Sequence, residues 1–202
     1  MYKSISNNPL VRMSYFPSHA LMTDIFNESE LQSIIDNHLL QGVNEANVGI
    51  DNKPVADIRI SRIRFHTANE DNMWIFDRLN KTIEYVNEQF YNFNLYGYDS
   101  YQFTEYRSEE KGFYNWHMDT FLGGIDPNFK GTRKLSLSLL LNDDFEGGNF
   151  LINEGEEKMP IKISLKKGTA VIFPSFMCHK VEPIIKGNRY SLVVWVNGPK
   201  FI

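Results

Sequence analysis

The chain has 202 residues, of which 42% are hydrophobic and 23% are charged, and its formal net charge is −4. This length and composition are typical of a globular protein with one core, and the charge argues against a protein that holds nucleic acid along its whole surface. The single cysteine, Cys178, excludes an internal disulfide, and no apolar run approaches the roughly 20 residues of a membrane-spanning helix. The N-terminal residues also lack the apolar stretch of a signal peptide, so a reduced, cytoplasmic protein is expected.

Two amphipathic helices are predicted in the first half of the chain. The first begins at Asn27, an N-cap residue with Glu30 three positions later, and Gly42 can end it. Apolar residues recur every three or four positions in both helices and are expected in the core. They are Leu31, Ile34, Ile35 and Leu39 in the first helix, and Ile75, Leu79, Ile83, Val86 and Phe90 in the second.

Short alternating segments dominate the rest of the chain. The segment ADIRISRIRF between the helices predicts a strand, and further strand-like segments follow one another from about residue 99. Helices followed by a run of strands favour a mainly β protein, a jelly roll buttressed by N-terminal α-helices. We expect one domain over residues 1–202, with a helical support region at 1–98 and the jelly-roll core at 99–202.

The triplet His117-Met118-Asp119 is the most informative motif. Side chains two residues apart on a strand share a face, so His117 and Asp119 can converge on one point. His179 follows a buried-looking strand and a turn, and is the best candidate for a third ligand. Two histidines and one carboxylate leave open positions on a metal and suit Fe(II). Taken alone, however, an H-x-D triplet is more often a hydrogen-bonded surface pair.

A second motif, Arg189-Tyr190-Ser191, begins ten positions after His179 (189 − 179 = 10). Arg189 and Ser191 share a strand face, and a guanidinium beside a hydroxyl is a good receptor for a carboxylate. A dicarboxylate such as 2-oxoglutarate could chelate the metal at one end and reach this pair with its far carboxylate. An isolated arginine here would more often pair with an acid at a strand edge, but the joint pattern favours the carboxylate receptor.

Three stretches of the chain resemble the Fe(II)/2-oxoglutarate-dependent dioxygenases, and within them the prolyl-hydroxylase-like branch that includes the bacterial PKHD-type hydroxylases. The stretches are Tyr114 to Asp119, RKLSLSLLLNDDFEGGNF and AVIFPSFMCHKVEPIIKGNRYSLVVWV, within about residues 57–199. The resemblance implies a double-stranded β-helix. It also implies that iron binds at a catalytic centre formed by three side chains and that three others bind 2-oxoglutarate. The iron ligands are His117, Asp119 and His179, and the co-substrate residues are Arg189, Ser191 and Tyr106.

The chain departs from these relatives at one position. Some of them carry a tyrosine in the strand after the H-x-D triplet, hydrogen-bonded to 2-oxoglutarate, where this chain has Leu140. The missing polar contact is then expected from Ser191, Ser136 or Ser138, and the sequence does not distinguish these serines.

The resemblance implies an enzyme that hydroxylates a C–H bond, with a peptidyl side chain (proline first) as the favoured target, and releases succinate and CO2. The implied cofactors are Fe(II), 2-oxoglutarate as co-substrate and dioxygen, with ascorbate as a reductant. A peptide or protein is therefore the expected partner. A free amino acid or other small molecule is an alternative substrate, and a non-catalytic metal-binding jelly-roll module is an alternative function. The carboxylate receptor predicted at Arg189 argues against the non-catalytic module, because a barrel that only binds metal needs no such receptor there.

Four arginines come close to forming a basic cluster: Arg59, Arg62, Arg64 and Arg107. On a strand, Arg62 and Arg64 share one face and Arg59 lies on the other. A solvated or salt-bridged face is the favoured interpretation, with substrate binding as the alternative.

The remaining histidines and the tryptophans beside the motifs are assigned structural places. His19, His38 and His66 have no partners at ligand spacing, and His38 is expected on the polar side of its helix. Trp116 is expected to face the core and Trp195 the barrel interior near the pocket. The segment from 120 to 132, with its Gly123-Gly124 pair, is either a lid over the metal or an ordinary loop.

Overall fold

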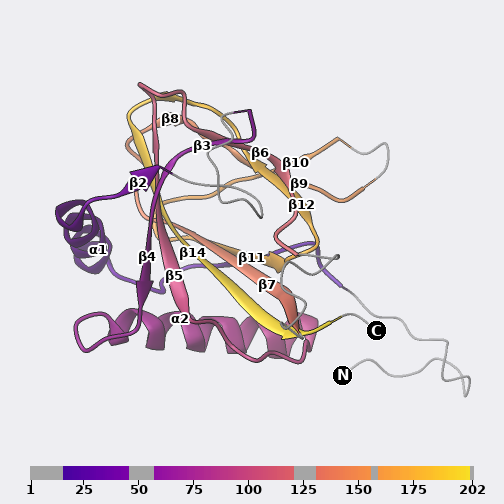
Figure 1. The fold of residues 1–202 in the computed structure, drawn as a ribbon. Helices are drawn as coiled ribbons and strands as arrows, with labels where there is room; N and C mark the ends of the chain where they lie inside the picture. The colour runs from indigo at the N-terminus through magenta and orange to yellow at the C-terminus, as the bar shows by residue number, and fades with distance from the viewer. Residues whose placement is uncertain (1–15, 46–56, 121–130, 156–158, 201–202) are drawn as a thin grey trace, which may run out of the picture.

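The computed structural model describes residues 16–45, 57–120, 131–155 and 159–200. Two antiparallel sheets face one another, and the helices cover the outer side of the larger sheet (Figure 1). The protein is therefore mainly β, a jelly roll buttressed by N-terminal helices, as the sequence predicts. None of the helices in these ranges is long and apolar enough to cross a membrane.

The larger sheet has seven strands in the order β1 (Ala20–Met22), β11 (Ala170–Pro174), β7 (Gly131–Leu140), β14 (Asn188–Pro199), β5 (Ser100–Arg107), β4 (Arg62–Thr67) and β2 (Asn44–Glu45). The smaller sheet has five strands in the order β10 (Ile161–Ile163), β9 (Phe150–Asn153), β12 (Cys178–Val181), β6 (Phe113–His117) and β3 (Arg59–Ile60). A separate pair joins β13 (Ile184–Lys186) to β8 (Glu146–Gly147). Beyond the two helices, the described part of residues 1–98 thus supplies four strands to the two sheets.

Helix α1 (Glu28–Gln41) begins and ends where the sequence predicts. The Asn27 side chain accepts the Glu30 backbone N–H at 2.9 Å, and the Glu30 carboxylate accepts the Asn27 backbone N–H at 2.8 Å. Such a reciprocal capping box satisfies two N–H groups that the helix cannot pair internally. Gly42 ends the helix at a φ of 77°, which glycine adopts without strain.

The buried stripe of α1 differs from the prediction at its last turn. His38 is only 3% exposed, whereas Leu39 is 39% exposed, so both predictions for these residues were wrong. Position 38 lies two turns after Leu31 and therefore continues the stripe, while position 39 falls at its edge. The imidazole finds a polar partner inside the core, because its Nε2 lies 3.2 Å from the Tyr101 hydroxyl.

Helix α2 (Met73–Val86) buries the predicted stripe as far as Val86 and then changes its winding. A π-helical turn, Asn87–Tyr91, follows directly, and the Asn92 N–H donates to the Asn87 carbonyl five residues back, at 2.7 Å. The wider turn needs one more residue than an α-turn. Tyr91 is therefore buried at the place predicted for Phe90, which is 38% exposed.

The seven-stranded sheet presents two different faces along the same strands. One face packs on the helices and is apolar; it includes Tyr101, Phe103, Leu135, Leu139, Leu192, Val194 and Val196. The other face points toward the smaller sheet and lines a pocket; it includes Gln102, Tyr106, Ser138, Arg189, Ser191 and Trp195. Since successive side chains alternate across a strand, a single sheet separates the core from the site.

Candidate active site

The pocket between the two sheets contains the three predicted metal ligands. His117 ends β6, and its backbone is paired with that of His179 in the neighbouring antiparallel strand β12. Asp119 follows two residues after His117 and is 5% exposed. One ligand atom from each of the three side chains lies within 4.8 Å of the others, which is close enough to hold one metal ion. No other such cluster occurs in the ranges that the structure describes.

Backbone carbonyls orient both imidazoles. The Nδ1 atom of His117 lies 2.7 Å from the Asn115 carbonyl oxygen, and that of His179 lies 3.0 Å from the Met177 carbonyl oxygen. A histidine that donates Nδ1–H in this way leaves its Nε2 lone pair for a metal. Both Nε2 atoms face the Asp119 carboxylate, at 3.6 and 3.7 Å. Burial lowers the pKa of His117 to about 3, with a contribution from His179, so this imidazole is neutral as a metal requires.

A short hydrogen-bonded chain holds the Asp119 carboxylate. The Ser136 hydroxyl donates to Asp119 Oδ2 at 2.7 Å, and the Ser175 hydroxyl lies 2.8 Å from that of Ser136. Burial alone would raise the pKa of Asp119, but His179, His117, Arg133 and the hydrogen bond from Ser136 together outweigh burial and lower it. The carboxylate is therefore ionised and fixed. Of the three candidate serines, Ser136 contacts this carboxylate, whereas Ser138 and Ser191 line the pocket.

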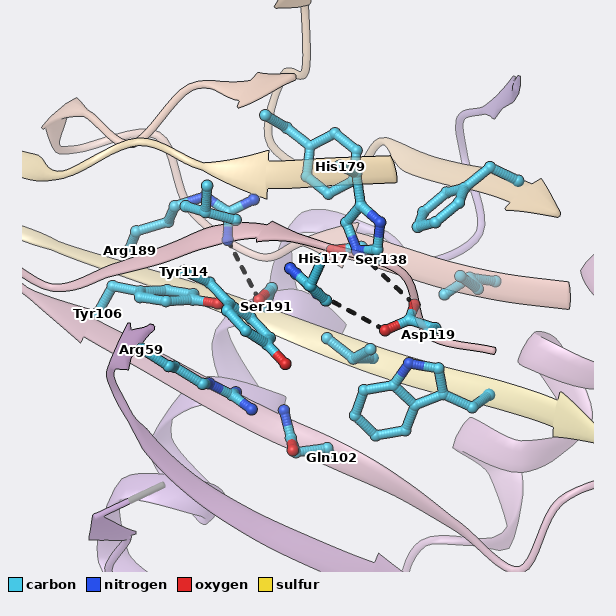
Figure 2. Close-up of a pocket in the computed structure, with 16 residues that line it drawn as sticks. Arg59, Gln102, Tyr106, Tyr114, His117, Asp119, Ser138, His179, Arg189 and Ser191 are labelled. Carbon is cyan, nitrogen blue, oxygen red and sulfur yellow. Dashed lines mark hydrogen bonds and ion pairs between the residues drawn. The ribbon is translucent and has the colours of Figure 1, made fainter. Parts of the chain in front are cut away.

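Arg189 occupies the inner end of the same pocket and is 1% exposed (Figure 2). Its Nη1 donates to the Ser191 hydroxyl at 3.2 Å, and its Cζ lies 5.7 Å from the centre of the Tyr106 ring. Its Nη2 has no hydrogen-bond partner among the described residues. A buried cation with an unsatisfied donor is costly unless an anion binds to it. The predicted co-substrate residues Arg189, Ser191 and Tyr106 thus lie together, and no described acidic residue pairs with Arg189.

The four clustered arginines separate in the structure. Arg62 and Arg107 form salt bridges with Glu110 and Glu105, as the favoured interpretation predicts. Arg59 does not follow that interpretation, because it is 7% exposed and lines the metal pocket. The reason is that β3 pairs with β6 of the smaller sheet, whereas β4 begins two residues later and pairs with β5 of the larger one.

An aromatic ring that sequence reasoning did not single out lies beside the metal ligands. The Tyr114 ring stacks on the His117 imidazole, with ring centres 3.4 Å apart, and the Arg59 Cζ lies 4.6 Å from the Tyr114 ring centre. Tyr114 is three residues before His117, at the start of the strand that carries the ligand. Tyr114 begins the stretch from Tyr114 to Asp119 that carries the family resemblance, and this position could have identified it as a site residue.

The two tryptophans beside the motifs take opposite places. Trp195 lines the pocket as predicted, with the Arg133 Cζ 4.2 Å from its ring centre. Trp116 was wrongly predicted to face the core. It alternates with His117 along β6, so its side chain lies on the outer side of the sheet, where the Lys180 Nζ approaches its ring centre at 5.1 Å. The segment proposed as a lid, including Gly123-Gly124, lies mostly outside the described residues.

Sequence comparisons place this site in a known superfamily. Residues 101–197 match the model of the 2OG-Fe(II) oxygenase superfamily. A PKHD-type hydroxylase of Alteromonas mediterranea is 30% identical over 96 residues, which is 46% of this chain and 41% of the relative. A PKHD-type hydroxylase of a Psychrobacter species is 37% identical over 89 residues, which is 42% of this chain and 33% of the relative. The matched part is thus well under half of each of these relatives.

Solved structures show the same fold at low sequence identity. A prolyl hydroxylase of Trichoplax adhaerens, solved with a peptide of a hypoxia-inducible factor, has a TM-score of 0.72 at 19% identity; the match covers 89% of this chain and 83% of that one. A Pseudomonas putida prolyl-4-hydroxylase has a TM-score of 0.68 at 18% identity and covers 92% of this chain and 94% of its own. The likeness covers about nine tenths of this chain in both cases.

Proposed function

We propose that the chain, whose residues 101–197 match the model of the 2OG-Fe(II) oxygenase superfamily, is a dioxygenase that hydroxylates a C–H bond of its substrate. The overall reaction takes the substrate C–H, 2-oxoglutarate and dioxygen to the substrate C–OH, succinate and CO2. One observation carries the proposal: a buried arginine with an unsatisfied donor, Arg189, shares a pocket with a three-ligand metal site.

The residues present fit both groups that the family implies. Two imidazoles with free Nε2 atoms and one ionised carboxylate suit Fe(II) and leave coordination positions open. His117, Asp119 and His179 would hold the iron. When bound, iron and its co-substrate supply the oxidising chemistry, while the protein supplies ligands, orientation and exclusion of water.

The chain's own residues perform three tasks in this proposal. Arg189 and Ser191, beside the Tyr106 ring, bind the far carboxylate of 2-oxoglutarate through charge-assisted hydrogen bonds. Ser136 keeps the Asp119 carboxylate in place. The buried Phe173 ring packs against the His179 imidazole, with ring centres 4.6 Å apart, and keeps water from this side of the pocket.

A peptidyl side chain is the proposed substrate, with proline as the first choice. The fold shared with prolyl hydroxylases from two organisms supports this choice. Hydroxylation of a free amino acid or another small molecule is the alternative substrate class. Ascorbate is proposed as the reductant that keeps the iron ferrous between turnovers.

Succinate formation in the absence of substrate tests the proposal. Protein loaded anaerobically with Fe(II) is given 2-oxoglutarate and air, and wild type is compared with Arg189→Ala. We expect slow turnover in wild type that the variant loses or recovers only at much higher 2-oxoglutarate. Arg62→Ala is the matched control, because Arg62 pairs with Glu110 outside the pocket.

Binding of 2-oxoglutarate to the metal-loaded protein is the second measurement. The weak visible charge-transfer band of a chelated complex reports it without any turnover. A wild-type protein that neither turns over nor binds 2-oxoglutarate contradicts the proposal and favours a non-catalytic metal-binding module.

A further inference from the structure

A similar side-chain arrangement occurs twice, and in both the arginine and the tyrosine line the pocket. In one copy, Arg189 donates to Ser191 two residues on and lies over the ring of Tyr106. In the other, the Arg59 Nε donates to the Ser61 hydroxyl two residues on, at 2.7 Å, and its Cζ lies 4.6 Å from the Tyr114 ring centre. Ser61 and Ser191 are both almost fully buried. An arrangement suited to one carboxylate is therefore present at a second place.

Arg59 lacks the partner that its neighbours have. Within the described ranges it forms no ion pair, whereas Arg62 and Arg107 each pair with a glutamate. Its Nε donates to the Ser61 hydroxyl, and no described residue accepts a hydrogen bond from its terminal Nη atoms. Since the side chain is 7% exposed, lines the pocket and has no acidic partner among the described residues, an anion that enters the pocket could balance its charge.

The co-substrate does not account for this second cation. 2-Oxoglutarate has two carboxylates: in the proposed function the one beside the oxo group goes to the metal and the other to Arg189. Figure 2 shows Arg59 and Arg189 on opposite sides of Tyr106 and Tyr114. A third carboxylate, held by Arg59, would then come from the substrate.

The stacking order places this carboxylate close to the metal. The Arg59 guanidinium lies over the Tyr114 ring, and the Tyr114 ring lies over the His117 imidazole at 3.4 Å between ring centres. One ring, that of Tyr114, thus lies between the Arg59 guanidinium and the imidazole of a metal ligand. This separation suits a carboxylate on the residue that is hydroxylated or on its immediate neighbour.

We propose that Arg59, with Ser61 and Tyr114, binds a carboxylate of the substrate. The preferred substrate then carries an acidic side chain or a free C-terminal carboxylate next to the hydroxylated carbon. The inference rests on the proposed function and narrows its substrate class. An arginine fork that holds a carboxylate by charge-assisted hydrogen bonds favours it over the matching amide by about ten- to hundredfold.

Three matched pairs of probes test the inference, and each pair differs only by a carboxylate in place of an amide. They are acetyl-alanyl-prolyl-glutamate amide against the glutamine peptide, acetyl-alanyl-prolyl-alanine against its C-terminal amide, and L-proline against L-prolinamide. The readouts are 2-oxoglutarate turnover above the level without probe, and the mass gain of one oxygen in the probe. The first two pairs distinguish a side-chain carboxylate from a C-terminal one, and the third identifies a free amino acid.

We expect wild type to use at least one carboxylate probe with a kcat/KM about ten- to hundredfold above that of its amide. Arg59→Gln should bring this ratio close to one, and Arg62→Gln should leave it unchanged. The wild-type ratio stands even if the Arg59 variant folds poorly, which its thermal unfolding would reveal.

Two results overturn the inference. One is a set of results in which no carboxylate probe has a higher kcat/KM than its amide, whether the protein hydroxylates both members of a pair or neither. The other is an Arg59→Gln protein that keeps the preference but needs much more 2-oxoglutarate, because Arg59 would then be a co-substrate residue. A wild-type protein without 2-oxoglutarate binding or turnover contradicts the proposed function itself, and the inference with it.

Discussion

The two faces of the seven-stranded sheet are made by the same strands but have opposite chemistry. On β14, Leu192 and Val194 pack against the helices with no exposed surface, while Arg189 and Ser191 are buried on the pocket side. The apolar face stabilises the fold through burial. The pocket face places a cation and hydroxyls where water is excluded, opposite the Asp119 carboxylate that follows β6 of the smaller sheet, and this costs stability. Substitutions on the apolar face should therefore change mainly the free energy of unfolding, whereas substitutions in the pocket should change mainly the binding of metal or 2-oxoglutarate.

The largest effect on the pocket face is expected for Asp119→Ala. Removal of the only carboxylate ligand should abolish Fe(II) binding and 2-oxoglutarate turnover. The urea midpoint of the metal-free protein should also fall, because the neighbours of Asp119 stabilise its ionised form in the folded state. Metal analysis and urea unfolding together check both parts. Near-normal turnover in this variant would falsify the metal assignment.

The matching change on the helix face is Leu139→Ala. Leu139 is fully buried, so the truncation should lower the free energy of unfolding by about 2–5 kcal/mol. The KM for 2-oxoglutarate of the folded fraction should not change. Urea unfolding and initial rates at low temperature measure the two quantities. A changed KM for 2-oxoglutarate with an unchanged free energy of unfolding would show that the apolar face also affects the pocket.

A smaller effect is expected behind the metal ligand, at Ser136. Ser136→Ala removes the hydrogen bond to Asp119 and should weaken metal binding by about ten- to hundredfold, as other residues that orient ligands do. Ser136→Thr keeps the hydroxyl and should retain most of the affinity. Titration with Co(II), followed by its visible spectrum, measures this without turnover. Equal affinity in the alanine and threonine variants would show that the hydrogen bond does not matter.

Ser191 should contribute less than Ser136. Its hydroxyl lies 3.2 Å from Arg189 Nη1, and a neutral hydroxyl that helps to bind a carboxylate contributes about 1 kcal/mol. Ser191→Ala should therefore raise the KM for 2-oxoglutarate roughly fivefold and leave the affinity for the metal unchanged. Steady-state kinetics and metal titration decide this, and a lost metal site would mean that the substitution disturbs the whole pocket.

A pH-dependent effect is expected on the helix face. Burial, with smaller contributions from His38 and Arg64, lowers the pKa of His66 from 6.5 to about 4. The unfolded chain therefore binds more protons than the folded one between these values, and the folded state loses stability as the pH falls from 6.5 toward 4. His66→Gln should flatten this part of the profile of urea midpoint against pH. A profile that keeps the wild-type slope would assign the loss to other groups.

Two pairs of site residues are predicted from their spacing along the chain, whereas His179 was identified from the strand and turn before it. His117 and Asp119 converge, and Arg189 and Ser191 share a face, because both pairs are two residues apart. Arg59 could not be placed in the pocket in this way. What it faces depends on β3 pairing with β6 rather than continuing as β4, and a change of sheet leaves no periodic signal.

The helices show the same limit. The capping box at Asn27 is a local motif, and its prediction was confirmed. Phe90 was misplaced because the i+4 rule assumes an α-turn, whereas the chain forms a π-turn there. His38 was misplaced because its polarity outweighed its position in the stripe, and only the structure provides the Tyr101 hydroxyl that makes its burial acceptable.

Because His117 pairs with His179 across β6 and β12, metal binding also reports whether these two strands have paired correctly. The two histidines are 62 residues apart in the chain (179 − 117 = 62) and meet only when these strands pair in this register. A slip of β12 by one residue would bring Cys178 or Lys180 opposite His117 and turn the His179 side chain to the other side of the sheet. Mispaired molecules would keep every ligand yet remain metal-free. The iron content of a preparation therefore counts its correctly folded molecules, and iron present during folding would select for them.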